Sequence, residues 1–141
     1  MSTALQMLRK LESIDVDLAA KVSIDHTKKH AESLQKVQLF QGIGSDDLAI
    51  IPSYTKRTKQ IKISKGQPID RVTLRDTGDF YRGIRIDVVG EVVRTDSIDH
   101  KSRDLQLKYG EEIFGLGTQA RTRYKKILLP EFIKQIKAYL K

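Results

Sequence analysis

The sequence predicts a single α+β domain in which a long N-terminal helix, in one piece or two, and a C-terminal helix pack on a small antiparallel sheet. Three observations predict this fold class. Residues 3–39 contain no glycine or proline, and their apolar residues have helical spacing. Two runs of β-branched residues flank Gly90, a pattern typical of an antiparallel hairpin. Residues 121–141 place apolar side chains at steps of three or four, which favours an amphipathic helix.

The size of the chain supports one domain, residues 1–141. A chain of 141 residues buries roughly 68% of the surface that its unfolded form exposes, which is enough for one core. Four Phe, five Tyr and no Trp make aromatic residues scarce, so the core must consist mostly of Leu, Ile and Val. The absence of cysteine excludes disulfide scaffolds, thiolate metal sites and thiol nucleophiles.

The N-terminal helix is expected over most of residues 3–39. Leu5, Leu8 and Leu11 begin an apolar stripe. Ser13 and Asp15 can divide this segment into a short helix and a longer one, because short polar side chains cap free backbone N–H groups at helix starts.

Residues 42–71 have the composition of turns and an exposed excursion. The stretch 42-GIGSDD-47 and Pro52 predict turns. Residues 53–71 are polar and basic, and their only apolar alternation is at Ile61 and Ile63, so we expect a flexible loop or a protruding arm. The candidate interface residues of this arm are Lys56, Arg57, Lys59, Lys62 and Lys65.

The sheet is predicted from residues 84–89 and 92–95, with Val72 and Leu74 in a third strand. One face of this sheet can then lie on a helix. Residues 104–110 are expected to be helical. Pro130 lies inside the C-terminal helical pattern, which predicts a kink there or a restart of the helix.

Catalytic signatures are weak. Gly42 and Gly44 are too close together for a phosphate-binding loop and precede two aspartates. His26 and His30 have a spacing compatible with a metal, but neighbouring lysines favour two surface histidines instead. We therefore predict neither a metal site nor a cofactor.

The segment 72-VTLRDTGDFYRGIRIDV-88 allows two interpretations. Asp76 and Asp79, with His100, could form the acid–base site of a small hydrolase. The favoured interpretation is a structural turn, in which Asp76 or Thr77 caps the chain and Gly78 adopts a conformation that other residues resist. Phe80 and Tyr81 would then dock on the core.

The net charge of +8 raises the question of nucleic-acid binding. The basic residues lie in several different segments without one dominant tract, which favours solvated surfaces in a generally positive field. A nucleic-acid-binding accessory protein stays as the alternative function. The charged N-terminal sequence is unlike a signal peptide, and no window has the roughly 20 apolar residues of a membrane span, so we expect a cytoplasmic site of synthesis and no membrane partner.

An ordered set of motifs resembles a known family. Residues 76-DTGDFY-81 lead into Ile84 and a hairpin, and Tyr109-Gly110 and 113-IFGLG-117 precede a terminal helix. This order resembles the tail-completion and head-to-tail connector proteins of tailed bacteriophages, over most of residues 30–141. In that family a Thr-Gly element introduces the first long strand, and a Tyr-centred turn near a glycine closes the sheet. The sequence departs from the family pattern at Asp79-Phe80-Tyr81 and in the basic insertion 53–71.

The resemblance implies a virion structural protein without enzymatic activity, cofactor or small-molecule substrate. Such a protein forms one copy of an oligomeric ring between the capsid portal and the tail, and its partners are portal and tail proteins. Residues 53–71 could order on assembly, against acidic surfaces of neighbouring rings or packaged DNA.

Overall fold

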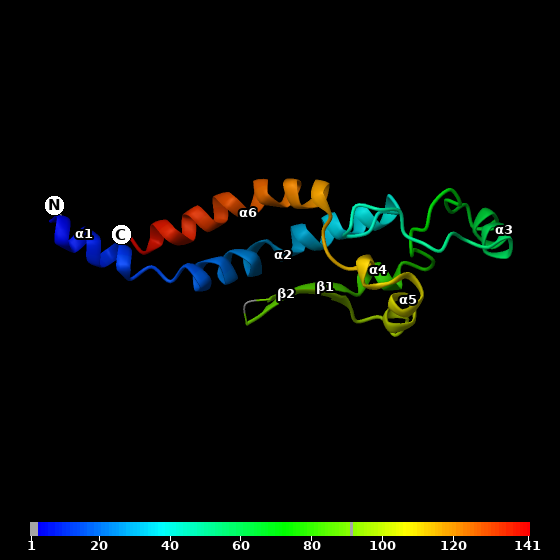
Figure 1. The fold of residues 1–141 in the computed structure, drawn as a ribbon, viewed down its shortest axis with the longest axis horizontal. Coiled ribbons are helices and arrows are strands. Elements are labelled where there is room, and N and C mark those ends of the chain that lie inside the picture. Colours follow the sequence, from blue (N-terminus) through cyan, green and yellow to red (C-terminus); the bar gives the residue numbers. More distant parts are fainter. Residues whose placement is uncertain (1–2, 91) are drawn as a thin grey trace.

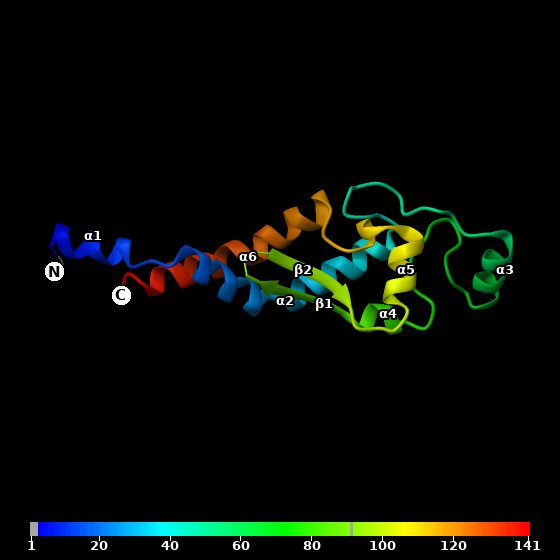
Figure 2. The same ribbon diagram turned by 60° about the horizontal axis from the view of Figure 1, so that its bottom comes forward.

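The computed structural model describes residues 3–90 and 92–141 as an elongated α+β molecule (Figure 1). Helices α2 and α6 lie side by side, the β1–β2 hairpin lies on α2, and α1 and α3 mark the two ends (Figures 1 and 2). The elements are α1 (Ala4–Glu12), α2 (Val16–Phe40), α3 (Lys56–Ser64), α4 (Asp79–Arg82), β1 (Ile84–Val89), β2 (Val92–Ser97), α5 (Ser102–Tyr109), the short 3-10 helix η1 (Glu111–Ile113) and α6 (Thr118–Ala138).

The N-terminal helical segment is divided in two, as the short polar residues predicted. Thr3 caps α1 through a reciprocal pair of hydrogen bonds with Gln6. Ser13 ends α1, and the Asp15 carboxylate accepts a hydrogen bond of 3.0 Å from the backbone N–H of Leu18 at the start of α2. Only Ile14 separates the two capping residues, so both helix ends are fixed by local side chains.

Helix α2 carries a row of small buried residues at every fourth position. Because small side chains let two backbones approach closely, this row suits close packing of that face of α2 against a neighbouring element. Helix α2 contacts both α6 and β1. The Thr27 hydroxyl is 2.7 Å from the Tyr124 hydroxyl of α6 and donates to the Ser23 carbonyl. The row consists of Ala19, Ser23, Thr27 and Ala31.

The sheet has two strands in the described residues, and the hairpin is confirmed. Strands β1 and β2 pair antiparallel, with Ile84 opposite Ser97 and Val89 opposite Val92. The predicted third strand at Val72 and Leu74 is wrong. Both side chains are buried, but they enter the core from an irregular segment in which Leu74 has φ of 56°. A left-handed backbone of this kind cannot continue a strand ladder.

The predictions for residues 53–71 and for Pro130 need correction. Residues 53–71 are not an irregular loop throughout, because α3 occupies residues 56–64 and is capped by the Thr55 hydroxyl, which accepts from the Thr58 N–H. Helix α6 runs through Pro130 as one element, so the predicted restart does not occur. Because proline has no backbone N–H, the carbonyl of Lys126, four residues earlier, loses its helical hydrogen bond. Lys126 and Pro130 are both exposed, so water can bond to that carbonyl instead.

The apolar core lies at the junction of α2, the hairpin base, α4 and the segment after α5. Its buried members are Leu39, Ile50, Val72, Leu74, Phe80, Tyr81, Ile84 and Ile113. Helix α6 buries only Ala120, and α1 buries no residue. The molecule therefore has a packed core towards the α3 end and a more open pair of helices towards α1.

Two buried glutamines of α2 fix the segment between η1 and α6. Gln35 accepts from the Gly115 N–H at 2.9 Å and donates to the Ile113 carbonyl. Gln38 accepts from the Gly117 N–H at 2.7 Å and donates to the Gly115 carbonyl at 3.0 Å. Each amide side chain thus satisfies one backbone donor and one backbone acceptor that water cannot easily reach.

None of the helices in residues 3–90 and 92–141 combines the length and the apolar content needed to cross a membrane.

Candidate functional site

The turn predicted at residues 76–81 is present and is built as expected. Gly78 has φ of 89°, a left-handed conformation that costs glycine little. The Thr77 hydroxyl accepts from the Asp79 N–H at 3.3 Å, at the start of α4. Asp79 pairs with Arg82 one turn later. These local bonds reverse the chain immediately before β1.

The two aromatic residues after the turn anchor it in the core. Phe80 and Tyr81 are both buried. The Phe80 ring lies 5.9 Å from the ring of Phe114, between centroids. The Tyr81 hydroxyl donates to the Thr73 carbonyl at 2.5 Å, and burial raises the pKa of this phenol, so it stays protonated as a donor. The docking that the sequence predicted for both rings is confirmed.

Helix α3 and the residues directly after it are tied to residues 75 and 76, at the start of the turn, by three polar contacts. Lys62 is buried, and its ammonium group donates to the Arg75 carbonyl at 3.0 Å and to the Gln67 side chain at 3.3 Å. Lys65 pairs with Asp76 at 2.6 Å. The Gln67 amide donates to the Asp76 carbonyl at 2.9 Å. These bonds hold the basic segment against the Asp76–Tyr81 turn.

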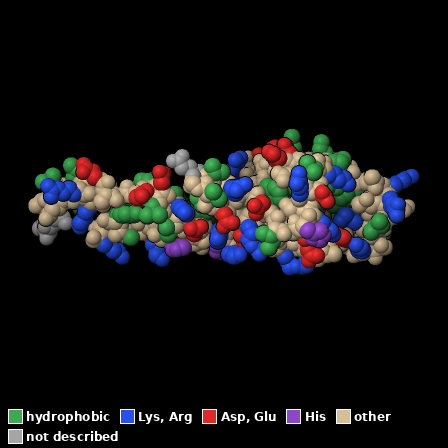
Figure 3. Space-filling model, turned by 90° about the horizontal axis from the view of Figure 1, so that it is seen from below, with side chains coloured by type: hydrophobic (Ala, Val, Ile, Leu, Met, Phe, Trp, Pro, Cys, Tyr) green, Lys and Arg blue, Asp and Glu red, His purple; other side chains and the backbone are tan. Residues whose placement is uncertain are grey.

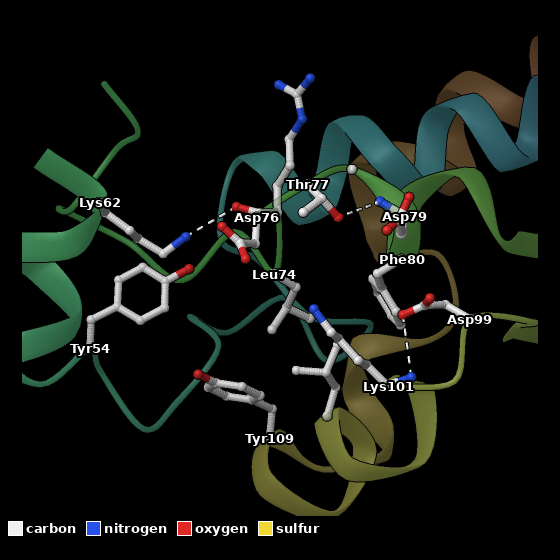
Figure 4. Close-up of a pocket in the computed structure, with 13 residues that line it drawn as sticks. Tyr54, Lys62, Leu74, Asp76, Thr77, Asp79, Phe80, Asp99, Lys101 and Tyr109 are labelled. Carbon is white, nitrogen blue, oxygen red and sulfur yellow. Dashed lines mark hydrogen bonds between the residues drawn. The ribbon is translucent and has the colours of Figure 1, made fainter. Parts of the chain in front are cut away.

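A cavity of about 210 Å³ lies between these elements (Figure 4). Figure 4 shows Tyr54 and Lys62 at the left, residues of the turn such as Thr77 and Asp79 above, and Tyr109 and Lys101 below. Its lining includes the apolar side chains of Leu74, Phe80 and Leu105 and the carboxylates of Asp76, Asp79 and Asp99. The structure therefore brings the turn, the basic segment and Tyr109 together around one hollow.

Tyr109 lines this cavity, but the Tyr109–Gly110 turn is built differently from what the resemblance implies. Tyr109 ends α5 and packs against the core, and Gly110 has φ of 93°. The Gly110 N–H donates to the Gln106 carbonyl at 2.8 Å and ends the helix. This turn joins α5 to η1 and adds no strand, so the expectation that it closes the sheet is wrong.

Two of the carboxylates that line the cavity are engaged in structural contacts. A hydrogen bond from Lys65 lowers the pKa of Asp76, and hydrogen bonds from Thr77 and Arg82 lower the pKa of Asp79. A general acid needs a raised pKa, and an acid–base pair needs two pKa values moved apart. Both pKa values here move in the same direction, so the two carboxylates are not arranged as such a pair.

The histidines considered in the sequence lie elsewhere. The His100 side chain is 83% exposed, with its ring 3.5 Å from Asp99, and does not line the cavity. His26 lies 2.8 Å from Glu131 of α6, and this contact lowers the pKa of Glu131. In residues 3–90 and 92–141, no group of three or more His, Asp or Glu side chains is placed to hold a metal ion.

The candidate arm residues divide into two kinds. Lys56, Arg57 and Lys65 are exposed and Lys59 is partly exposed at the α3 end of the molecule. Lys62 is buried and cannot contact a partner without breaking its bonds to the turn. The prediction that Lys62 belongs to the exposed interface is therefore wrong, because the Tyr54 ring, 4.8 Å from its ammonium group, and the Arg75 carbonyl enclose it.

Sequence reasoning missed Tyr54 as a member of this site. Its hydroxyl accepts from the Thr73 N–H at 2.9 Å and its ring faces Lys62. The only signal in the sequence is an isolated aromatic residue in a polar segment, next to the helix-capping Thr55.

Comparison of the chain with protein-family models, curated proteins and solved structures found no significant match.

Proposed function

We propose that this chain is a non-enzymatic structural subunit of an oligomeric ring at the head-to-tail junction of a tailed bacteriophage, where it joins portal and tail by protein contacts. The observation that carries the proposal is that the side chains of the Asp76–Tyr81 turn make structural contacts. Its glycine, hydroxyl, carboxylates and rings all serve to fix the hairpin, α3 and the core relative to one another. A turn of this kind shapes a scaffold, and the resemblance of its ordered motifs to connector proteins supplies the class of scaffold.

The surface of the molecule supports an assembly role. Helix α1 buries nothing, and α6 leaves large apolar side chains such as Leu129 and Ile133 exposed. The hairpin tip also exposes Val89, Val92 and Val93. Apolar surface of this extent is typical of proteins that contact partners.

The test is assembly with the proteins encoded beside it. Light scattering and electron microscopy of the purified chain, mixed with portal or tail proteins from the same genome, are expected to show a ring-shaped complex. A chain that stays monomeric and binds none of these proteins contradicts the proposal. A neighbouring portal, capsid or tail-tube gene would support it independently.

A second candidate, nucleic-acid binding, is favoured by the α3 end. Residues 53–71 carry six Lys or Arg residues and one acidic residue, Asp70, which is paired with Arg71. Figure 3, in contrast, shows Lys and Arg spread along a whole face with Asp and Glu between them. Filter binding to duplex DNA across salt concentrations separates the two candidates, because binding through phosphates weakens steeply with salt. Negligible binding at low salt excludes this candidate.

A further inference from the structure

Helix α1 presents an apolar face that none of the described residues covers. Leu5, Leu8 and Leu11 are 57%, 50% and 50% exposed. At 3.6 residues per turn they fall within about 120° of the helix circumference. Lys10 lies on the opposite side of the helix, and Arg9 borders the leucine stripe next to Leu5. The helix therefore has the amphipathic pattern of a packed element but lies beyond the start of α2 without a partner (Figures 1 and 2).

Such a helix needs a partner to be stable. A helix of nine residues is marginal by itself in water, because the cost of nucleation is spread over few hydrogen bonds. The Thr3 capping box favours the first turn but contributes only a local stabilisation. Most helical stability in proteins comes from burying an apolar face, so the sequence of α1 is suited to a surface outside this monomer.

The same chain offers an uncovered apolar groove. It lies between α2 and α6, has a volume of about 350 Å³, and Lys125 is its one charged lining residue. Leu129 in this groove is 57% exposed. The lining residues are Ala20, Ile24, Lys125, Leu128, Leu129 and Phe132.

The helix and the groove match in length and chemistry. At 1.5 Å per residue, Leu5 to Leu11 spans about 9 Å, and Lys125 to Phe132 spans about 10.5 Å. The exposed face of α1 consists of leucines, and the groove is lined mostly by aliphatic side chains together with the ring of Phe132. The capped junction at Ser13 and Asp15 directs α1 away from its own groove, so the groove it can reach in this arrangement belongs to a neighbouring molecule.

We propose that α1 of one copy docks in the α2–α6 groove of a second copy of this chain. This inference rests on the proposed ring function and names the contact that builds the ring. The two surfaces are different patches of one molecule, so the contact is head-to-tail and repeats until the ring closes.

A single contact of this kind between two copies is expected to be weak. A stable interface buries roughly 800 Å² on each partner. A nine-residue helix is about 13.5 Å long and about 10 Å across, so one face of it supplies well below that area. In a closed ring each copy gives one helix and receives another, which makes the assembly concentration-dependent and cooperative.

Two single substitutions test the contact from its two sides. Leu8→Glu places a charge in the α1 face, and Leu129→Glu places one in the groove. Both side chains are at least half exposed in the monomer, so neither change should unfold it. Leu107→Glu is the matched control, because Leu107 is 76% exposed on α5, outside both surfaces. Sedimentation equilibrium measures the mass of the species in solution. Protein concentrations up to about 1 mM are used because weak contacts are populated there.

The wild type and Leu107→Glu are expected to exceed the monomer mass of 16.1 kDa as concentration rises, while Leu8→Glu and Leu129→Glu stay monomeric. A mixture of those two variants is the decisive sample. The intact α1 of Leu129→Glu fits the intact groove of Leu8→Glu, so the mixture should form a dimer of twice the monomer mass and nothing larger.

Three results overturn the inference. These are a wild type that is monomeric at every concentration, single variants that assemble like the wild type, and a mixture that stays monomeric. Failure of this contact is distinguishable from failure of the proposed function. If Leu8→Glu still forms rings with portal or tail proteins, the connector function stands and the α1 contact is excluded.

Discussion

The residue that best shows the difference between pattern and structure is Lys62. It belongs to a basic cluster whose other members are wholly or partly exposed, yet it is buried and bonded to the Arg75 carbonyl. A buried ammonium group is tolerated when its protons have acceptors, and here a carbonyl, an amide oxygen and the Tyr54 ring surround it. Lys62 therefore acts as an internal link between α3 and the Asp76–Tyr81 turn.

We predict that Lys62→Ala lowers the free energy of unfolding by about 1–3 kcal/mol, because it removes a buried charged hydrogen bond and leaves the Arg75 carbonyl without its partner. Urea denaturation measures the change. Lys56→Ala, at an exposed position of the same helix, should stay within about 0.5 kcal/mol of the wild type. Equal effects of the two substitutions would contradict the role of Lys62.

At this scale the sequence predicts the turn but not the burial of lysine. Thr77, Gly78 and the two aromatic residues have local reasons for their conformations, and those reasons can be read from neighbouring residues. The burial of Lys62 depends on Tyr54 and Arg75, which approach it only after the chain folds, so spacing along the sequence carries no signal of it.

At the scale of elements, the start of α6 depends on a residue far away in the sequence. The Gly117 N-cap has no side chain to cap the helix. The Asp47 carboxylate accepts from the Thr118 N–H at 2.7 Å and from the Thr118 hydroxyl at 2.5 Å. These bonds lower the pKa of Asp47 below its usual value of 3.8. A carboxylate at this position also interacts favourably with the helix dipole.

We predict that Asp47→Asn weakens the folded state at neutral pH and makes its stability less dependent on acid. A carboxyl whose pKa is lower when folded stabilises fully above its unfolded pKa of 3.8, and the stabilisation is lost as pH falls through the folded value. Urea midpoints measured between pH 7 and pH 2 should therefore fall less steeply for the variant. Asp25→Asn, at an exposed position of α2, should keep the wild-type profile.

The elements themselves were predicted unevenly, for physical reasons. The hairpin and the two N-terminal helices have strong local signals, in β-branched runs around a glycine and in capping residues. Helix α3 was missed because Ile61 and Ile63, both exposed, give its sequence no apolar face. The third strand was predicted wrongly because Val72 and Leu74 alternate like a strand but are buried in an irregular segment.

At the scale of the whole molecule, the packed core and the protruding ends have separate roles. The core joins α2, the hairpin base, α4 and η1, and contains no residue of α1 or α6. The sequence predicts this α+β class and the order of its main elements. It does not predict that α1 projects from the body, because an apolar stripe indicates burial without naming the surface that buries it.

We predict that deletion of residues 1–12 leaves the unfolding of the dilute monomer unchanged within about 0.5 kcal/mol, since the described residues of α1 bury no side chain. The measurement is the urea midpoint at low protein concentration, with circular dichroism as the probe. A large loss of stability would mean that α1 packs within its own chain.

The row Ala19, Ser23, Thr27 and Ala31 has an evolutionary consequence. A larger side chain at any of these four buried positions would push α2 away from the element packed against it, whereas a change at an exposed position of the same helix, such as Asp25, causes no such overlap. Distant homologues of this protein should therefore retain small residues at those four sites and keep Gln35 and Gln38, even where their charged surface residues differ. A sequence profile that gives most weight to these six positions would detect distant homologues better than one that gives most weight to the basic residues.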